Sequence, residues 1–177
     1  MLALDFIKKK SVGVEIGVHK GVFSSQILRH VRPASLTLVD PWKHMDDSAY
    51  ERSHYGGERI DQAGMDQRYQ QVLKRFGKQM GEGVVKVIRS DSAGAAKEFE
   101  DGSLDFVYID GDHSYEAVKS DLALYYPKVK KGGLIIGDDY EDGRWWKDDV
   151  IRAFHEFIAA NPVQIEFKLG VQIGVRV

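Results

Sequence analysis

The chain has 177 residues, of which 43% are hydrophobic, and its 25 basic and 27 acidic side chains give a formal net charge of −2. This length predicts one domain with a sizeable buried core, and the near-neutral charge disfavours nucleic acid or an anionic membrane as a partner. The absence of cysteine excludes disulfides, zinc–thiolate sites and a cysteine nucleophile.

The first ten residues carry a short apolar patch followed by three lysines, Lys8 to Lys10. A secretory signal has the opposite order, with its charge before the apolar run. No apolar run approaches the roughly 18 residues that span a bilayer. We therefore expect a cytoplasmic protein that does not insert into a membrane.

Short β-branched apolar runs alternate along the chain with longer segments of helical spacing. We predict strands at residues 12–16, 36–39, 84–88, 106–109, 134–136, 163–167 and 171–177, and helices at residues 21–31, 67–76, 93–100, 114–126 and 148–160. Such alternation is typical of a parallel sheet with helices on both faces. The last two strands have only three residues between them and must pair antiparallel. The predicted fold is an α/β, Rossmann-like three-layer sandwich: a mostly parallel seven-stranded sheet with an antiparallel C-terminal hairpin and a reversed strand at its edge.

Residues 42–64 form a polar, irregular segment with aromatic residues and a Gly56-Gly57 hinge. Because the segment follows the second strand directly, we expect it to overhang a site at the carboxyl edge of the sheet, as a lid or as a surface loop. The interpretation is one domain over residues 1–177 with a lid-like insertion at about 42–64.

Three strand ends carry residues suited to ligand binding, and ligands of such sheets bind beyond the carboxyl ends of the strands. Gly17 and Gly21 follow the first strand, in a loop that allows close approach to a ligand or forms a plain strand-to-helix turn. Asp40 follows the second strand and can hold ribose hydroxyls or cap a turn. Asp91 and Ser92 follow the third, where Asp91 can accept an adenine amino group, cap the next helix, or do both.

Four carboxylates follow the fourth and fifth strands, namely Asp110, Asp112, Asp138 and Asp139. Gathered at one edge they would repel one another, and a divalent cation such as magnesium, calcium or manganese would relieve the repulsion. Alternatively, Asp112 and Asp139 face water and cap turns. His113 is the candidate general base, or else a solvent-facing or aspartate-bonded residue at a helix start.

The segment from Val14 to Gly21, Val-Glu-Ile-Gly-Val-His-Lys-Gly, resembles the first motif of class I S-adenosylmethionine-dependent methyltransferases, especially the small O-methyltransferases. The terminal hairpin is also a mark of that fold. The resemblance implies that Glu15 and Gly17 line the methionine portion of S-adenosylmethionine, that Asp40 holds the ribose, and that Asp91 with Ser92 flanks the adenine. It also places Val18, Gly21 and Asp110 at the cofactor site.

The segments containing Asp110 and Asp138-Asp139 resemble the metal-binding motifs of cation-dependent O-methyltransferases, of the caffeoyl-coenzyme-A and catechol types and of macrolide sugar O-methyltransferases. The resemblance implies a divalent cation, with magnesium favoured, held by Asp110, Asp138 and Asp139. It further implies methylation of a small-molecule hydroxyl, for which we predict Asp110 and His113 as the catalytic residues. Trp145 and Trp146 follow this region, where one can wall the acceptor pocket or both can pack against core and rim.

Relatives with small-molecule acceptors usually carry extra N-terminal helices over the site, whereas here the first strand starts at about Val12. The acceptor pocket is therefore open, completed by the insertion, or completed by a second subunit in a homodimer. Three other functions remain: a nicotinamide-dependent oxidoreductase, which the glycine spacing disfavours; a non-catalytic protein of the same fold; and a metal-independent methyltransferase. The chain has no Asn-Pro-Pro-Tyr-like motif for flipped bases, and its charge disfavours a nucleic-acid substrate.

Overall fold

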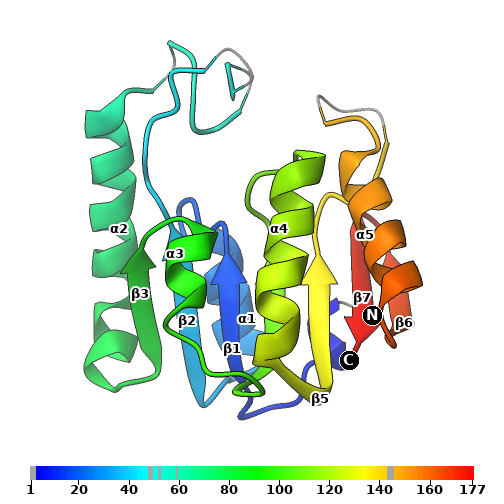
Figure 1. Ribbon diagram of the computed structural model, residues 1–177. Helices are drawn as coiled ribbons and strands as arrows, with labels where there is room; N and C mark the ends of the chain where they lie inside the picture. The colour runs from blue at the N-terminus through cyan, green and yellow to red at the C-terminus, as the bar shows by residue number, and fades with distance from the viewer. Residues whose placement is uncertain (1–2, 48–49, 52, 59, 143–145) are drawn as a thin grey trace.

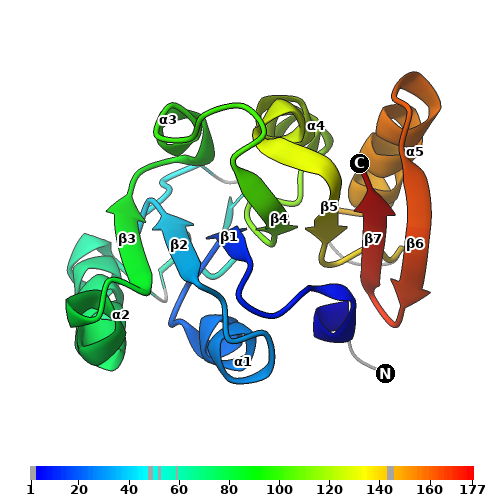
Figure 2. The same ribbon diagram turned by 90° about the horizontal axis from the view of Figure 1, so that it is seen from below.

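A seven-stranded sheet forms the centre of the protein in the computed structural model, which describes residues 3–47, 50–51, 53–58, 60–142 and 146–177. The strands are β1 (Val12–Ile16), β2 (Ser35–Asp40), β3 (Val85–Arg89), β4 (Leu104–Ile109), β5 (Val129–Gly137), β6 (Gln164–Leu169) and β7 (Gln172–Arg176). Their order across the sheet is β3-β2-β1-β4-β5-β7-β6 (Figures 1 and 2).

The first five strands pair in parallel, and β7 runs antiparallel to both β5 and β6. This confirms the predicted fold class and its C-terminal hairpin. One detail of the prediction is wrong, because the reversed strand does not lie at the edge. The hairpin folds back so that β7 pairs with β5, and β6 becomes the edge strand.

Helices cover both faces of the sheet. They are α1 (Val22–His30), α2 (Gln62–Gly81), α3 (Ser92–Ala96), α4 (Tyr115–Tyr125) and α5 (Asp149–Ala160), with short 3₁₀ turns at η1 (Ala3–Phe6) and η3 (Tyr126–Lys128). Viewed from below, α3, α4 and α5 lie on one face, and α1, α2 and η1 lie on the other (Figure 2). Each face has its own apolar core, one centred on Val107, Leu122 and Phe154 and the other on Ile27, Leu38 and Phe76. The result is the predicted three-layer sandwich.

The helix after the insertion begins at Gln62, five residues earlier than predicted. Asp61 starts it, because its side chain accepts the N–H of Gly64 at 2.8 Å and so satisfies one of the unpaired amides of the first turn. Only Met65, Val72 and Phe76 are buried along this 20-residue helix, so its first turn carries little apolar signal. Within the described residues, no helix combines the length and the apolar character needed to cross a bilayer.

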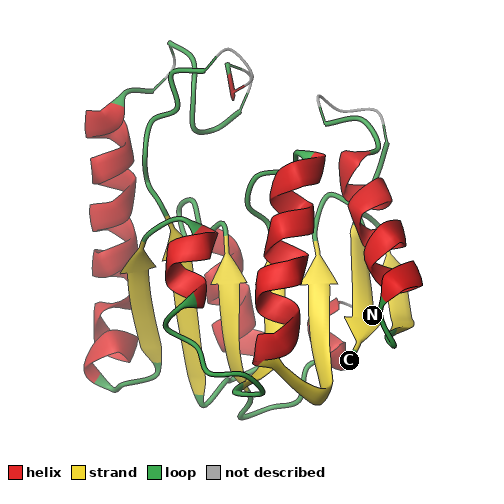
Figure 3. Cartoon of the chain, in the orientation of Figure 1, coloured by secondary structure: helices red, strands yellow, loops and turns green. Residues whose placement is uncertain are grey.

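Strand β1 pairs with β2 on one side and with β4 on the other, so the chain order reverses at β1. The carboxyl ends of the five parallel strands open onto the same edge, where the connecting loops gather below the described part of the segment between β2 and α2 (Figures 1 and 3). In sheets of this kind the ligand site lies at such a reversal. The ligand site is therefore expected at the carboxyl ends of β1 and its neighbouring strands.

Candidate active site

A cavity of about 970 Å³ lies at this edge of the sheet. Its wall contains most of the residues singled out in the sequence: Gly17, Asp40, Asp91, Ser92, Asp110, His113, Asp138 and Asp139. The structure thus brings together strand ends that are far apart in the sequence. Glu15, Val18 and Gly21 lie beside the cavity but not in its wall.

The loop after β1 passes very close to the loop after β4. Gly17 adopts a positive φ of 87°, and its N–H donates to the carbonyl of Val39 at 2.9 Å. A Cβ atom added to Gly17 would lie 1.9 Å from the carbonyl oxygen of Asp110, so no larger residue fits without moving backbone. Gly21, with φ of 70°, starts α1. The predicted tight loop is present, and it brings the ends of β1 and β4 together.

The Asp40 carboxylate holds this loop in place. Its Oδ2 accepts the N–H groups of Val18 at 3.0 Å and His19 at 2.8 Å, and its Oδ1 accepts the N–H of Trp42 at 2.7 Å. The Tyr55 hydroxyl donates a further hydrogen bond to Oδ2. Burial raises the pKa of Asp40, and these donors partly offset the rise. Asp40 is therefore both a cavity-wall carboxylate and the anchor of the loop between β1 and α1.

Glu15 lies on β1, behind the cavity wall. Its side chain is 1% exposed, and burial raises the pKa of its carboxyl well above the ordinary value. Ser24 on α1 lies beside it and partly offsets the shift, while Asp110 and Asp40 add to it. Glu15 is not among the residues that line the cavity, and its contact with the methionine portion of a cofactor stays a prediction.

At the end of β3 the two predicted residues face different partners. The side chain of Asp91 is the N-cap of α3 and accepts the N–H of Gly94 at 2.7 Å. The Ser92 hydroxyl donates to the carboxylate of Asp121, which comes from α4. The capping role that the sequence allowed for Asp91 is present.

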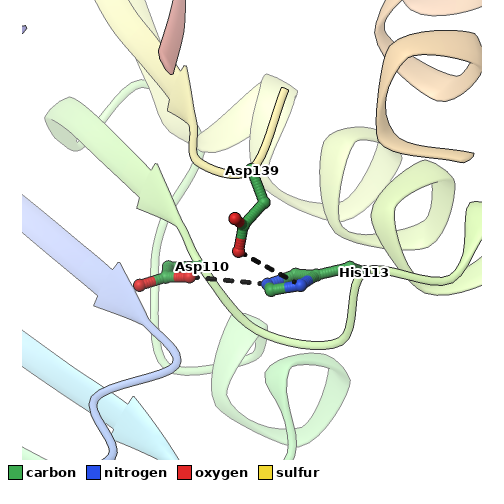
Figure 4. A group of neighbouring side chains, drawn as sticks. All are labelled: Asp110, His113 and Asp139. Carbon is green, nitrogen blue, oxygen red and sulfur yellow. Dashed lines mark ion pairs between the residues drawn. The ribbon is translucent and has the colours of Figure 1, made fainter. Parts of the chain in front are cut away.

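A compact group of Asp110, His113 and Asp139 lies at the ends of β4 and β5. The His113 ring is between the two carboxylates, with Nε2 3.4 Å from Asp110 and Nδ1 3.3 Å from Asp139 (Figure 4). Burial raises the pKa of Asp110 to about 6. Burial alone would lower the pKa of His113, but the neighbouring carboxylates outweigh it and raise that pKa.

These three residues form the group of potential metal ligands found among the described residues, with one ligand atom from each lying within 4.8 Å of the others. Asp138, predicted as a ligand, lies in the cavity wall but is engaged elsewhere. Its Oδ1 accepts the N–H of Asp139 at 3.0 Å, and its Oδ2 accepts the hydroxyl of Tyr108. Asp139 itself has a positive φ of 53°.

The described part of the insertion lies against the cavity. Its two tyrosines reach different strand ends, since the hydroxyl of Tyr55 bonds Asp40 and that of Tyr50 bonds Asp112. Trp42, at the start of the insertion, is fully buried and donates its indole N–H to the carbonyl of His19 at 2.8 Å. The insertion is thus in contact with both sides of the cavity.

Sequence reasoning missed several wall residues, among them Asp121 and Tyr55. Asp121 is buried on α4, and the available signal was an acidic residue among the apolar positions Val118, Leu122 and Tyr125 of that helix. Tyr55 was noted as an aromatic residue, but nothing in the sequence indicated its partner. Trp146 lines the cavity and packs edge-on against His113, with the two ring centroids 4.7 Å apart. Trp145 lies outside the described residues.

Comparison with known proteins assigns the family. Residues 14–140 match a family model described as Methyltransferase domain. The chain belongs to this family. The match confirms the class I S-adenosylmethionine-dependent methyltransferase predicted from the sequence and disfavours the nicotinamide-dependent oxidoreductase. The cation-dependent O-methyltransferase subtype stays a prediction.

Solved structures share the fold of this chain, and one sequence relative matches part of it. A putative methyltransferase from Streptococcus mutans, solved in complex with SAH, aligns with a TM-score of 0.63 at 11% identity over 98% of this chain and 94% of that one. Aeropyrum pernix fibrillarin with natively bound S-adenosyl-L-methionine aligns with a TM-score of 0.62 at 11% identity, over 98% and 68%. An uncharacterized protein of Acanthamoeba polyphaga mimivirus is 46% identical over 56 residues, 32% of this chain and 25% of that protein. The matched segment thus spans a quarter of that relative.

Proposed function

We propose that this methyltransferase transfers a methyl group from S-adenosylmethionine to a hydroxyl group of a small molecule, with a divalent cation beside the acceptor. The observation that carries the proposal is one cavity with two chemically different ends. Asp40 and Asp91 lie at the ends of β2 and β3, and the Asp110–His113–Asp139 group lies at the ends of β4 and β5. An adenosine can occupy the first end while an acceptor lies at the second.

The residues present fit the cofactor. Gly17 leaves the turn after β1 free of side chain, and the Asp40 carboxylate is held in the wall beside it. A carboxylate at this strand end suits the two hydroxyls of a ribose. The two solved proteins of the same fold that hold S-adenosyl-L-methionine or SAH support the same choice of ligand for this chain. Bound S-adenosylmethionine supplies an electrophilic methyl group on its sulfonium.

The residues at the other end fit a divalent cation, with one change from the sequence prediction. Asp110 and Asp139 are brought together, and the geometry offers His113 as the third ligand where the sequence offered Asp138. A carboxylate-only set suits magnesium, calcium or manganese, whereas an imidazole nitrogen suits zinc, copper, iron or nickel. A bound cation lowers the pKa of a coordinated hydroxyl and orients it.

Methyl transfer needs a group that takes the hydroxyl proton. The acceptor oxygen bonds to the methyl carbon, the carbon–sulfur electrons go to sulfur, and the proton leaves to a base. His113 is in the wall beside both carboxylates and is the candidate base. A histidine that holds a cation must be neutral and uses a ring nitrogen to do so, so ligand and base are alternative roles for His113.

Calorimetric titration with S-adenosylhomocysteine tests the cofactor assignment. We expect one site per chain, lost in Asp40→Ala and kept in Asp101→Ala, which changes an exposed aspartate that pairs with Lys128. The proposal fails if the unmodified protein shows no binding heat and no thermal stabilisation with this ligand.

Titration with Mg²⁺ and with Mn²⁺ tests the cation site. We expect Asp139→Ala to lose cation binding and to keep cofactor binding. His113→Ala loses cation binding if His113 is a ligand, and keeps it but loses methyl transfer if His113 is the base. Asp138→Ala loses cation binding if the set predicted from the sequence is correct. A protein that binds neither ion, and whose methyl transfer is insensitive to a chelator, belongs to the metal-independent class.

A further inference from the structure

Asp121 is a buried carboxylate in the cavity wall that the proposed function leaves without a role. It lies on α4 and is 4% exposed. Ala117, one turn before it, and Ser120, the residue before it, line the same cavity, so this part of α4 forms a wall beside the start of α3. A buried acidic residue without a cationic partner is costly, and such positions are often functional.

The contacts of Asp121 leave one oxygen available. Its Oδ1 accepts the hydroxyl of Ser92, and the backbone carbonyl of Ser92 accepts the Tyr125 hydroxyl at 2.9 Å. This chain of bonds fixes the carboxylate against the start of α3. Its Oδ2 accepts no hydrogen bond from the residues that the structure describes, and it lies 3.9 Å from the position of a Cβ on Gly111, another wall residue.

The charges around Asp121 are acidic. Burial raises the pKa of this carboxyl to about 6, the Ser92 bond lowers it, and Asp112 and Asp91 raise it further. At neutral pH this part of the cavity offers acceptors and would repel a ligand that presents only acceptors. A ligand group that donates hydrogen bonds relieves both the desolvation and the repulsion.

The neighbouring Asp91 is less suited to that task. Its side chain is exposed at the rim, and its Oδ1 already accepts the N–H of Gly94. The sequence allowed Asp91 to accept the adenine amino group or to cap α3, and the resemblance placed it beside the adenine. Asp121 is instead the buried, pre-oriented carboxylate at this end of the cavity.

We infer that Asp121 accepts a hydrogen bond from the exocyclic amino group of the cofactor's purine and selects a 6-aminopurine over a 6-oxopurine. This inference rests on the proposed function, because it requires an adenosine at the β2–β3 end of the cavity. A carboxylate pairs with the amino group of adenine, whereas the oxygen of hypoxanthine would face it as a second acceptor. A site that hydrogen-bonds a ligand group rejects the analogue that lacks it.

The test compares the affinities of S-adenosylhomocysteine and its 6-oxopurine analogue by calorimetry. We expect the unmodified protein to prefer the adenine ligand by about tenfold or more, the effect of one lost hydrogen bond to a charged group. Asp121→Asn keeps the acceptor for Ser92 and adds an amide donor that suits the 6-oxo group. We expect the affinities of this variant for the two ligands to differ by less than about threefold.

Asp91→Asn is the matched control, and we expect it to keep the preference of the unmodified protein. Ser92→Ala removes the bond that orients Asp121 and should reduce the preference partially. A role of Asp121 in stability alone would change the melting temperature and leave the ratio of the two affinities unchanged.

The outcomes separate this inference from the proposed function. Normal binding of S-adenosylhomocysteine with an unchanged ratio in Asp121→Asn overturns the assignment of Asp121 only. If Asp91→Asn instead reduces the ratio of the two affinities, Asp91 is the residue that recognises the amino group. No binding of S-adenosylhomocysteine to the unmodified protein overturns the proposed function, and this inference with it.

Discussion

Substitution of Gly17 by alanine should lower the free energy of unfolding, because this glycine allows the ends of β1 and β4 to approach each other closely. The added Cβ would lie 1.9 Å from the carbonyl oxygen of Asp110 and 2.8 Å from the Cα of Gly111, and both are backbone atoms. Relief requires the ends of β1 and β4 to separate, although the Asp110 N–H donates to the carbonyl of Ile16 at 2.8 Å.

The magnitude follows from two costs. A non-glycine residue in the left-handed region costs about 1–2 kcal/mol, and overpacking of a tight site costs about 1–3 kcal/mol. We expect Gly17→Ala to lower the free energy of unfolding by about 2–5 kcal/mol. The whole unfolding free energy of a domain is only about 5–15 kcal/mol, so this is a large part of it. Urea denaturation followed by circular dichroism measures this difference.

Gly77→Ala is the control, since Gly77 lies in α2 and an added Cβ would meet nothing within 4 Å. It should stabilise the protein by about 0.5–1 kcal/mol, because alanine favours a helix over glycine. If Gly17→Ala is as stable as the unmodified protein, the close approach of β1 and β4 described above is incorrect.

Three further predictions concern single side chains. The pKa of Asp121 is raised to about 6 in the folded protein, so its contribution to stability is present below about pH 4 and is lost as the pH rises to about 6. The stability of Asp121→Asn relative to the unmodified protein should therefore rise by on the order of 2–3 kcal/mol between pH 4 and pH 7, and a difference that is constant with pH in urea titrations would contradict this. Tyr55→Phe removes a donor that occupies Asp40, so S-adenosylhomocysteine should bind about three- to tenfold more tightly by calorimetry, and weaker binding would indicate that Tyr55 helps to hold the ligand. Lys86→Ala breaks only an exposed ion pair with Glu98 and should change the unfolding free energy by less than about 1 kcal/mol; a larger loss would reveal a role beyond that pair.

The fold could be predicted because the patterns that indicate its strands lie in short, continuous segments of the sequence. Each strand is a short apolar run, and the three residues between the last two predicted strands force an antiparallel hairpin whatever the rest of the chain does. The start of α2 was missed because its first turn, Gln62-Ala63-Gly64-Met65, contains a glycine and only one buried apolar residue, Met65. The pairing of β7 with β5 depends on how the hairpin folds back, and no local pattern encodes that choice.

The site was predictable as a set of strand ends but not as a set of contacts. Parallel strands deliver Asp40, Asp91 and Asp110 to one cavity, and the sheet topology alone implies this. Which carboxylate is free is decided by neighbours distant in the sequence. Tyr108 engages Asp138, and the amides of the β1–α1 loop engage Asp40.

The indole of Trp146 gives the protein an optical reporter. It is 5% exposed and meets the ring of His113 edge-on, with an interplanar angle of 76°. Protonation of an adjacent imidazole, or a paramagnetic ion beside it, quenches indole emission. The Trp42 indole donates to His19 in the loop between β1 and α1, so a Trp145→Phe variant would leave one fluorophore near each end of the cavity. Emission could then follow the arrival of each ligand separately, without any added label.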